Sequence, residues 1–139
     1  MPTLSRWFIK AGLVYTVLGL LMATLVIAQP VLGLPPQLMS LRPVYLHLLM
    51  VGWVTQLIMG VAYWMFPKYS KESPRGSERL GWLIFILLNL GLIIRTIGEP
   101  LAVLQPESGM SWLLVVSAVC QLAAGWMFVA NTWQRVKER

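Results

Sequence analysis

His47 is the only histidine of this 139-residue sequence, and it lies inside an almost unbroken apolar run. Residues 43–66 contain no Asp, Glu, Lys or Arg, and the run is longer than the roughly 20 residues that a bilayer-spanning helix needs. Pro43 suits a first helical turn and Pro67 ends the helix, so His47 falls about one turn inside the membrane. An ionisable side chain at that depth needs a partner, which makes His47 the first functional candidate.

Two further ionisable residues, Arg95 and Glu99, lie in another apolar segment and are spaced as a helical ion pair. A neutral imidazole can ligate haem iron, an apolar wall can contact the porphyrin, and guanidinium groups can bind the two propionates. The combination of His47, bulky apolar neighbours and arginines at the same depth or nearer the surface therefore fits a haem. In the alternative interpretation, His47 hydrogen-bonds a neighbouring helix and Arg95 pairs only with Glu99.

Four apolar segments must position these side chains, and they lie at 7–28, 43–66, 80–104 and 110–133. Hydrophobic residues make up 58% of the sequence and charged residues 12%, which is typical of an integral membrane protein and not of a soluble domain. We predict an all-α fold, a four-transmembrane-helix bundle that forms one domain over 1–139. The first segment has features of a signal peptide, but its apolar run is long for one, so a retained spanning helix is expected.

The distribution of basic residues predicts the orientation of the bundle. Nine basic residues lie near the termini or in the middle loop, on one side of the membrane. Arg42 lies in a connector on the opposite side, and Arg95 lies near that opposite face. Both termini are therefore predicted to be cytoplasmic, and His47, Arg95 and Glu99 converge toward the outer face. The net charge of +6 is dispersed among the loops, so we expect a lipid bilayer and no nucleic acid as partner. The expected location is a bacterial or archaeal inner (plasma) membrane.

Helical periodicity assigns the side chains of the second segment to two faces. At about 100° per residue, the residues that share the face of His47 are Val51, Val54 and Ile58. Those on the other side are Gly52, Gln56, Gly60 and Tyr63. The first face is expected to accept a bulky apolar guest, and the second to pack closely against other helices.

The third and fourth segments carry aligned residues of their own. On the third, the residues that line up are Gly81, Ile84, Leu88, Gly91, Arg95 and Glu99. On the fourth, a small and polar seam consists of Ser117, Gln121 and Gly125. The polar groups Gln56, Asn89, Cys120 and Gln121 are expected to form hydrogen bonds in helix packing and not to act as ligands.

The run YLHLLMVGWVTQLIMGVAYWMFPK, residues 45–68, resembles the histidine-bearing transmembrane helix of the haem-copper oxidase subunit I superfamily. That helix carries a similar H-x-H, a hydrophobic run, a Gly, an aromatic pair and an F-P ending. Its second histidine ligates the low-spin haem and its first the active-site haem. His47 matches the second histidine, while Tyr45 stands in place of the first. The resemblance implies a haem b ligated by His47, with propionates held by Arg95 and Arg42.

The sequence also departs from that superfamily. Copper and the active-site haem need several further histidines, which this chain lacks, so it is not expected to reduce oxygen or nitric oxide alone. We expect a small membrane cytochrome that transfers electrons or binds a small ligand. The candidate cofactor-binding residues are His47, Arg42, Arg95, Met50, Val51 and Val54, with His47 as ligand of the haem iron.

The second axial ligand has two candidate sources. One is His47 of another copy in a homodimer, with the haem at or near the interface, because an isologous contact supplies the same ligand twice. The other is a methionine near the outer ends of the segments, Met39 or Met110. Two interpretations without haem also remain: an accessory or assembly subunit of a respiratory membrane complex, and a small transporter in which Arg95 and Glu99 face an aqueous path.

Overall fold

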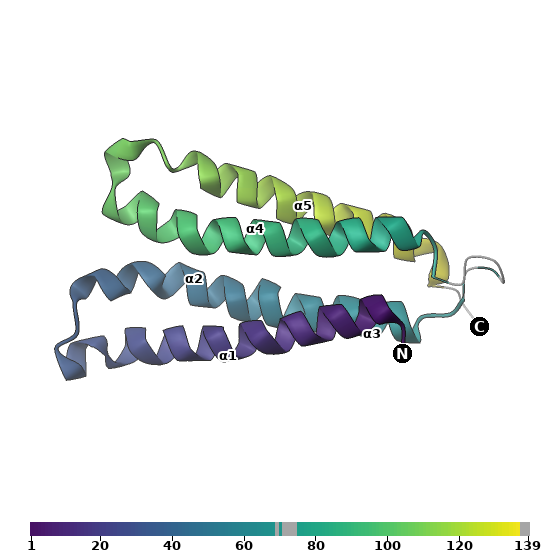
Figure 1. The fold of residues 1–139 in the computed structure, drawn as a ribbon, viewed down its shortest axis with the longest axis horizontal. Helices are drawn as coiled ribbons and strands as arrows, with labels where there is room; N and C mark the ends of the chain where they lie inside the picture. The colour runs from purple at the N-terminus through teal and green to yellow at the C-terminus, as the bar shows by residue number, and fades with distance from the viewer. Residues whose placement is uncertain (69, 71–74, 137–139) are drawn as a thin grey trace.

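The computed structural model describes residues 1–68, 70 and 75–136, which form long helices joined by short connectors (Figure 1). The first hairpin consists of α1 (Thr3–Leu32), the 3-10 turn η1 (Pro36–Leu41) and one continuous helix formed by α2 (Arg42–His47), η2 (Leu48–Thr55) and α3 (Gln56–Met65). The second consists of α4 (Glu78–Leu104), η3 (Pro106–Ser108), α5 (Trp112–Thr132) and η4 (Trp133–Arg135). The polar connector 68–79 and the basic tail 134–139 lie partly outside the described residues.

Among the described residues, four helices are long and apolar enough to cross a membrane: Thr3–Leu32, Pro36–Met65, Glu78–Leu104 and Trp112–Arg135. The predicted all-α architecture of four spans is therefore confirmed, and the chain is an integral, multi-pass membrane protein. The start of α1 and the end of α5 lie at one end of the bundle, which we call the termini end (Figure 1). Connections 33–41 and 105–111 lie at the opposite, connector end. Which end is cytoplasmic stays a prediction.

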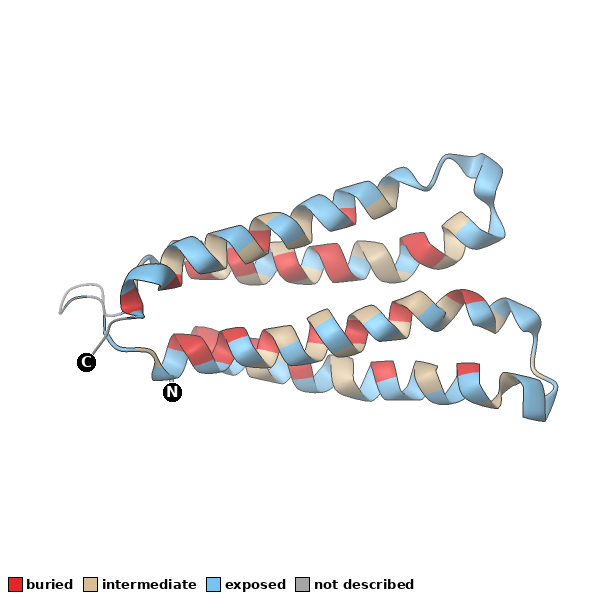
Figure 2. Cartoon of the chain, turned by 180° about the vertical axis from the view of Figure 1, so that it is seen from behind, coloured by how far each residue is buried: buried red, intermediate tan, exposed pale blue. Residues whose placement is uncertain are grey.

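The two hairpins pack against each other through a core at the termini end. This core consists of Leu4, Phe8, Met59, Tyr63, Ile84, Leu88 and Ala124. Elsewhere much of α1 and α5 is exposed (Figure 2). Many of the exposed side chains on these helices are large and apolar. In water such a surface would be unfavourable, whereas lipid tails are as apolar as the side chains that they contact.

Segment η2 is π-helical, and it changes which side chains share a face. A π-helical turn contains more residues than the 3.6 of an α-helical turn. In a regular α-helix His47 and Gln56, nine residues apart, would lie about 180° from each other. In the structure both face α4, because His47 lies 3.8 Å from Glu99 and Gln56 hydrogen-bonds Asn89. The expectation that Gln56 lies opposite His47 is therefore wrong, since it assumed an uninterrupted α-helix.

Gly52, within η2, allows the ring of Tyr15 to pack directly on the helix backbone. A Cβ atom built on Gly52 would lie only 2.8 Å from Cγ of Tyr15, closer than real side chains approach. The Tyr15 hydroxyl donates to Oδ1 of Asn89 at 2.9 Å, and Nε2 of the buried Gln56 donates to the same oxygen at 3.1 Å. The expected packing role of Gln56 and Asn89 is confirmed, and their network joins α1, α3 and α4.

The predicted seam between α4 and α5 is present in part. Ser117 Oγ donates to the backbone carbonyl of Gly91 at 2.7 Å, and Gln121 Nε2 donates to Ser117 Oγ at 3.1 Å. A Cβ atom on Gly91 would lie 2.9 Å from Cγ of Gln121, so the helices need a glycine here. Gly125 does not belong to this seam, because within the described chain nothing lies within 4 Å of a Cβ built on it.

Arg135 ties the end of α5 to the end of α3. Its guanidinium donates to the carbonyl oxygens of Tyr63, Phe66 and Pro67 at 3.3, 2.9 and 3.0 Å, and the residue is 1% exposed. The last carbonyls of a helix have no partner within the helix, so a guanidinium with several donors can satisfy them together. We refer to these contacts as the Arg135 clamp.

The contact of Gly52 with Tyr15 predicts a loss of stability on substitution. Gly52→Ala should destabilise the protein by about 1–3 kcal/mol, because the ring of Tyr15 must shift and its bond to Asn89 weakens. The matched control is Gly125→Ala, which adds the same methyl group to a helix where space is open, and it should be neutral or stabilising by about 0.4–1 kcal/mol. Thermal unfolding of both variants in one detergent measures the difference, and equal melting temperatures would contradict the contact.

Candidate functional site

The helix that begins at Arg42 fixes the tautomer of the His47 side chain. Nδ1 of His47 lies 2.9 Å from the backbone carbonyl oxygen of Pro43, one turn earlier. A carbonyl oxygen only accepts hydrogen bonds, so Nδ1 must carry the hydrogen. In a neutral imidazole the other nitrogen, Nε2, then holds the lone pair. The His47 side chain is 32% exposed, so it is neither fully packed nor fully open.

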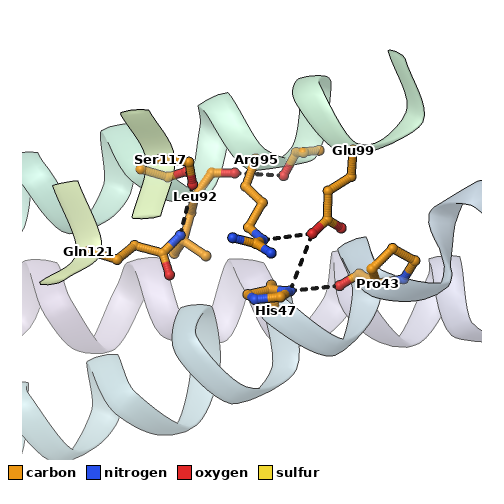
Figure 3. Close-up of polar contacts among 9 residues, drawn as sticks. Pro43, His47, Leu92, Arg95, Glu99, Ser117 and Gln121 are labelled. Atoms are coloured by element: carbon orange, nitrogen blue, oxygen red, sulfur yellow. Dashed lines mark hydrogen bonds and ion pairs between the residues drawn. The ribbon is translucent and has the colours of Figure 1, made fainter. Parts of the chain in front are cut away.

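Helix α4 brings a charged pair to the same place. Nε of Arg95 donates to Oε1 of Glu99 at 2.7 Å, which confirms the ion pair predicted from the spacing. The same Oε1 lies 3.8 Å from Nδ1 of His47 (Figure 3). The carboxylate therefore faces the edge of the imidazole that carries the Nδ1 hydrogen. We call His47, Arg95 and Glu99 the charged triad.

The carboxylate of Glu99 is the most buried group of the charged triad. Its side chain is 6% exposed, and Oε2 has no hydrogen-bond partner in the part of the chain that the structure describes. A buried carboxylate is costly without compensation, and Arg95 provides that compensation. The Nη nitrogens of Arg95 have no partner among the described residues, so this guanidinium keeps donors for a second anionic group.

Among the described residues, no hydrogen bond or ion pair joins the other predicted site residues to the charged triad. Arg42 is exposed at the first position of α2, toward the connector end. Met50 is 62% exposed and Val54 is also exposed, so both face the surroundings of the bundle. Val51 is partly buried and packs against the core. The structure therefore brings together His47 and Arg95 of the predicted site residues. It adds Glu99, which the sequence placed at the same depth but which was not among the predicted cofactor-binding residues.

Tyr15 is a polar residue of the bundle interior that the sequence analysis missed. Its hydroxyl joins the Gln56 and Asn89 network near the middle of α1, where the sequence shows only an aromatic residue in an apolar run. The one available signal was the coincidence of three polar side chains at similar depth in three predicted helices. Tyrosine hydroxyls usually find a partner when buried, which makes such a coincidence informative.

The donor set limits the chemistry that this chain can support alone. Within residues 1–68, 70 and 75–136, no group of three or more His, Cys, Asp and Glu side chains is placed to hold a metal ion. Iron in a porphyrin needs only axial ligands from protein, because the macrocycle supplies the other four nitrogens. The charged triad offers one imidazole nitrogen without a hydrogen and guanidinium donors without a partner among the described residues. Comparison of the chain with protein-family models, curated proteins and solved structures finds no match.

Removal of Arg95 should destabilise the protein more than removal of Arg42. Arg95→Met leaves Glu99 buried without its counter-charge, which we expect to cost about 3 kcal/mol. Arg42→Met makes the same change at an exposed position and should cost less than about 0.5 kcal/mol. Thermal unfolding in detergent compares the two variants. A double variant, Arg95→Met with Glu99→Met, should recover most of the loss, and failure to recover would show that the pair is not the cause.

Proposed function

We propose that this chain is a small haem b-binding membrane protein that transfers electrons or binds a small ligand, with His47 as an axial ligand. The observation that carries the proposal is the hydrogen bond from Nδ1 of His47 to the Pro43 carbonyl. Metal-ligating histidines almost always donate their other ring N–H to a carbonyl or carboxylate, which fixes the tautomer and the ring orientation. His47 has this arrangement, with Glu99 as a second acceptor nearby.

Charge at the connector half of the bundle supports the same proposal. A haem has an apolar macrocycle and two propionates, so its site needs cations beside an apolar wall. Arg95 keeps free donors after it binds Glu99, and Arg42 lies exposed at the start of the helix that carries His47. Both arginines lie toward the connector end, as His47 does. Arg95 and, less directly, Arg42 would therefore hold the propionates.

A second copy of the chain is the proposed source of the remaining axial ligand. Four helices offer little protein around a macrocycle, and the apolar side chains of Met50 and Val54 are exposed close to His47 in sequence. A two-fold contact at this surface would supply His47 twice and cover both side chains. The alternative source of the second axial ligand is a methionine. Met39 and Met110 are both exposed and lie in segments at the connector end, so either could be that ligand.

His47→Ala tests the ligand directly. The wild-type protein, expressed with ample haem, should give sharp b-type bands in a dithionite-reduced minus oxidised spectrum, and the variant should lose them. Added imidazole should restore bands to the variant, since it replaces the missing ligand at the vacated position. A structural role of His47 alone would not be rescued in this way. A folded wild-type protein without Soret absorbance, or a variant with unchanged bands, would overturn the proposal.

Glu99→Gln tests the carboxylate beside Nδ1. The variant should keep its b-type bands while the midpoint potential moves in the positive direction by tens of millivolts, as an order of magnitude. The physical reason is that a negative charge near the iron stabilises the oxidised, more positive state. The control is Glu107→Gln, which removes an exposed carboxylate in η3 and should leave the potential unchanged. A spectroelectrochemical titration measures both, and equal shifts would exclude a specific role for Glu99.

A further inference from the structure

A cavity of about 280 Å³, open to the outside of the bundle, lies between α1 and α4, toward the termini end. The charged triad lies toward the opposite end, so the cavity belongs to a different part of the molecule. Its lining includes Trp7, Lys10, Ala11, Tyr15, Phe85 and Asn89. Helices α1 and α4 belong to different hairpins (Figure 1). The cavity therefore lies at the boundary between the hairpins. We call it the inter-hairpin cavity.

Aromatic rings form one wall of the inter-hairpin cavity. The rings of Trp7 and Phe85 meet edge to face with centroids 6.4 Å apart. Phe85 is held in turn by Phe8 and Trp82, whose centroids lie 5.1 and 6.0 Å from its own. A ring fixed by three neighbours offers a rigid surface, and flat molecules gain affinity from contact with aromatic side chains.

Two polar groups in the lining retain capacity for hydrogen bonds. The Tyr15 hydroxyl donates its hydrogen to Asn89, which leaves the lone pairs of its oxygen to accept a bond. Lys10 is exposed, and no acceptor for its ammonium is present among the described residues. Asn89 is already occupied, since its amide nitrogen donates to the Phe85 carbonyl at 2.7 Å. The lining therefore offers a cation, an acceptor oxygen and an aromatic wall.

We propose that the inter-hairpin cavity binds a lipid-soluble quinone, a planar ring with polar oxygens and a long apolar tail. The ring would lie against Trp7 and Phe85, and one of its oxygens would accept a hydrogen bond from Lys10. Its reduced form could also donate a hydroxyl hydrogen to Tyr15. A phospholipid acyl chain would fill the volume but has no polar atom to bond Lys10 or the Tyr15 oxygen. The binding does not depend on a haem at His47.

A photoreactive azido-quinone tests the site on the full chain in detergent. Labelling, mapped by mass spectrometry, should concentrate on 7–15 and 85–89 and saturate, and a short-tail quinone such as decylubiquinone should compete it away. Ala11→Phe should reduce the affinity about tenfold or more by filling the cavity, and Tyr15→Phe should reduce affinity for the quinol about three- to tenfold by removing one hydrogen bond. Val17→Phe, on the exposed surface of α1, should change nothing.

The same measurement on His47→Ala separates this inference from the proposed function. Undiminished labelling of that variant is expected even if the wild-type protein carries no haem. Unsaturable or scattered labelling would overturn the quinone site and leave a space filled by lipid. Should Ala11→Phe fail to fold, as judged by gel filtration, Lys10→Gln serves in its place and should weaken binding of the oxidised quinone. Equal affinity in the wild type and in every folded variant would also overturn the site.

Discussion

Polar side chains inside a membrane-spanning bundle must find partners within the protein, because lipid offers none. Here the partners come from across the boundary between the two hairpins. Gln56 and Tyr15 of the first hairpin bind Asn89 of the second, and His47 faces Glu99. Both contacts depend on the π-helical segment η2, which turns His47 and Gln56 toward the same neighbour. The register of η2 thus links the packing of the hairpins to the geometry of the charged triad.

Hydropathy was sufficient to predict the four spans, because long apolar runs bounded by proline, glycine and charge admit few other structures. The pair of Arg95 and Glu99 also followed from spacing alone, since it needs only one helix. The π-helical segment could not be predicted, because nothing in the apolar run 48–55 shows whether its backbone hydrogen bonds follow the α-helical or the π-helical pattern. The Arg135 clamp and the inter-hairpin cavity depend on how the two hairpins pack against each other. The periodicity of side chains within one helix carries no information about that packing.

The two ends of the bundle differ in how they are held together. At the termini end, Tyr63 packs with Phe8 and Phe128, and Asn131 donates to the Tyr63 hydroxyl at 3.0 Å. At the connector end, η1 and α2 pack against α4, and the contacts include the electrostatic contact of His47 with Glu99. The termini end is therefore held by packed rings and a side-chain hydrogen bond, and the connector end by helix packing together with charged groups.

The Arg135 clamp can form only late in biosynthesis. The guanidinium that caps α3 lies 68 residues after Pro67, one of the residues whose carbonyl it binds. A ribosome adding 5–20 residues per second needs roughly 3 to 14 s to synthesise that stretch. During this interval the first hairpin can insert into the bilayer, but the carbonyls at the end of α3 must rely on water at the membrane surface. Final closure of the bundle is consequently a late step of biosynthesis, set by the pace of translation and not by the insertion of the first two helices.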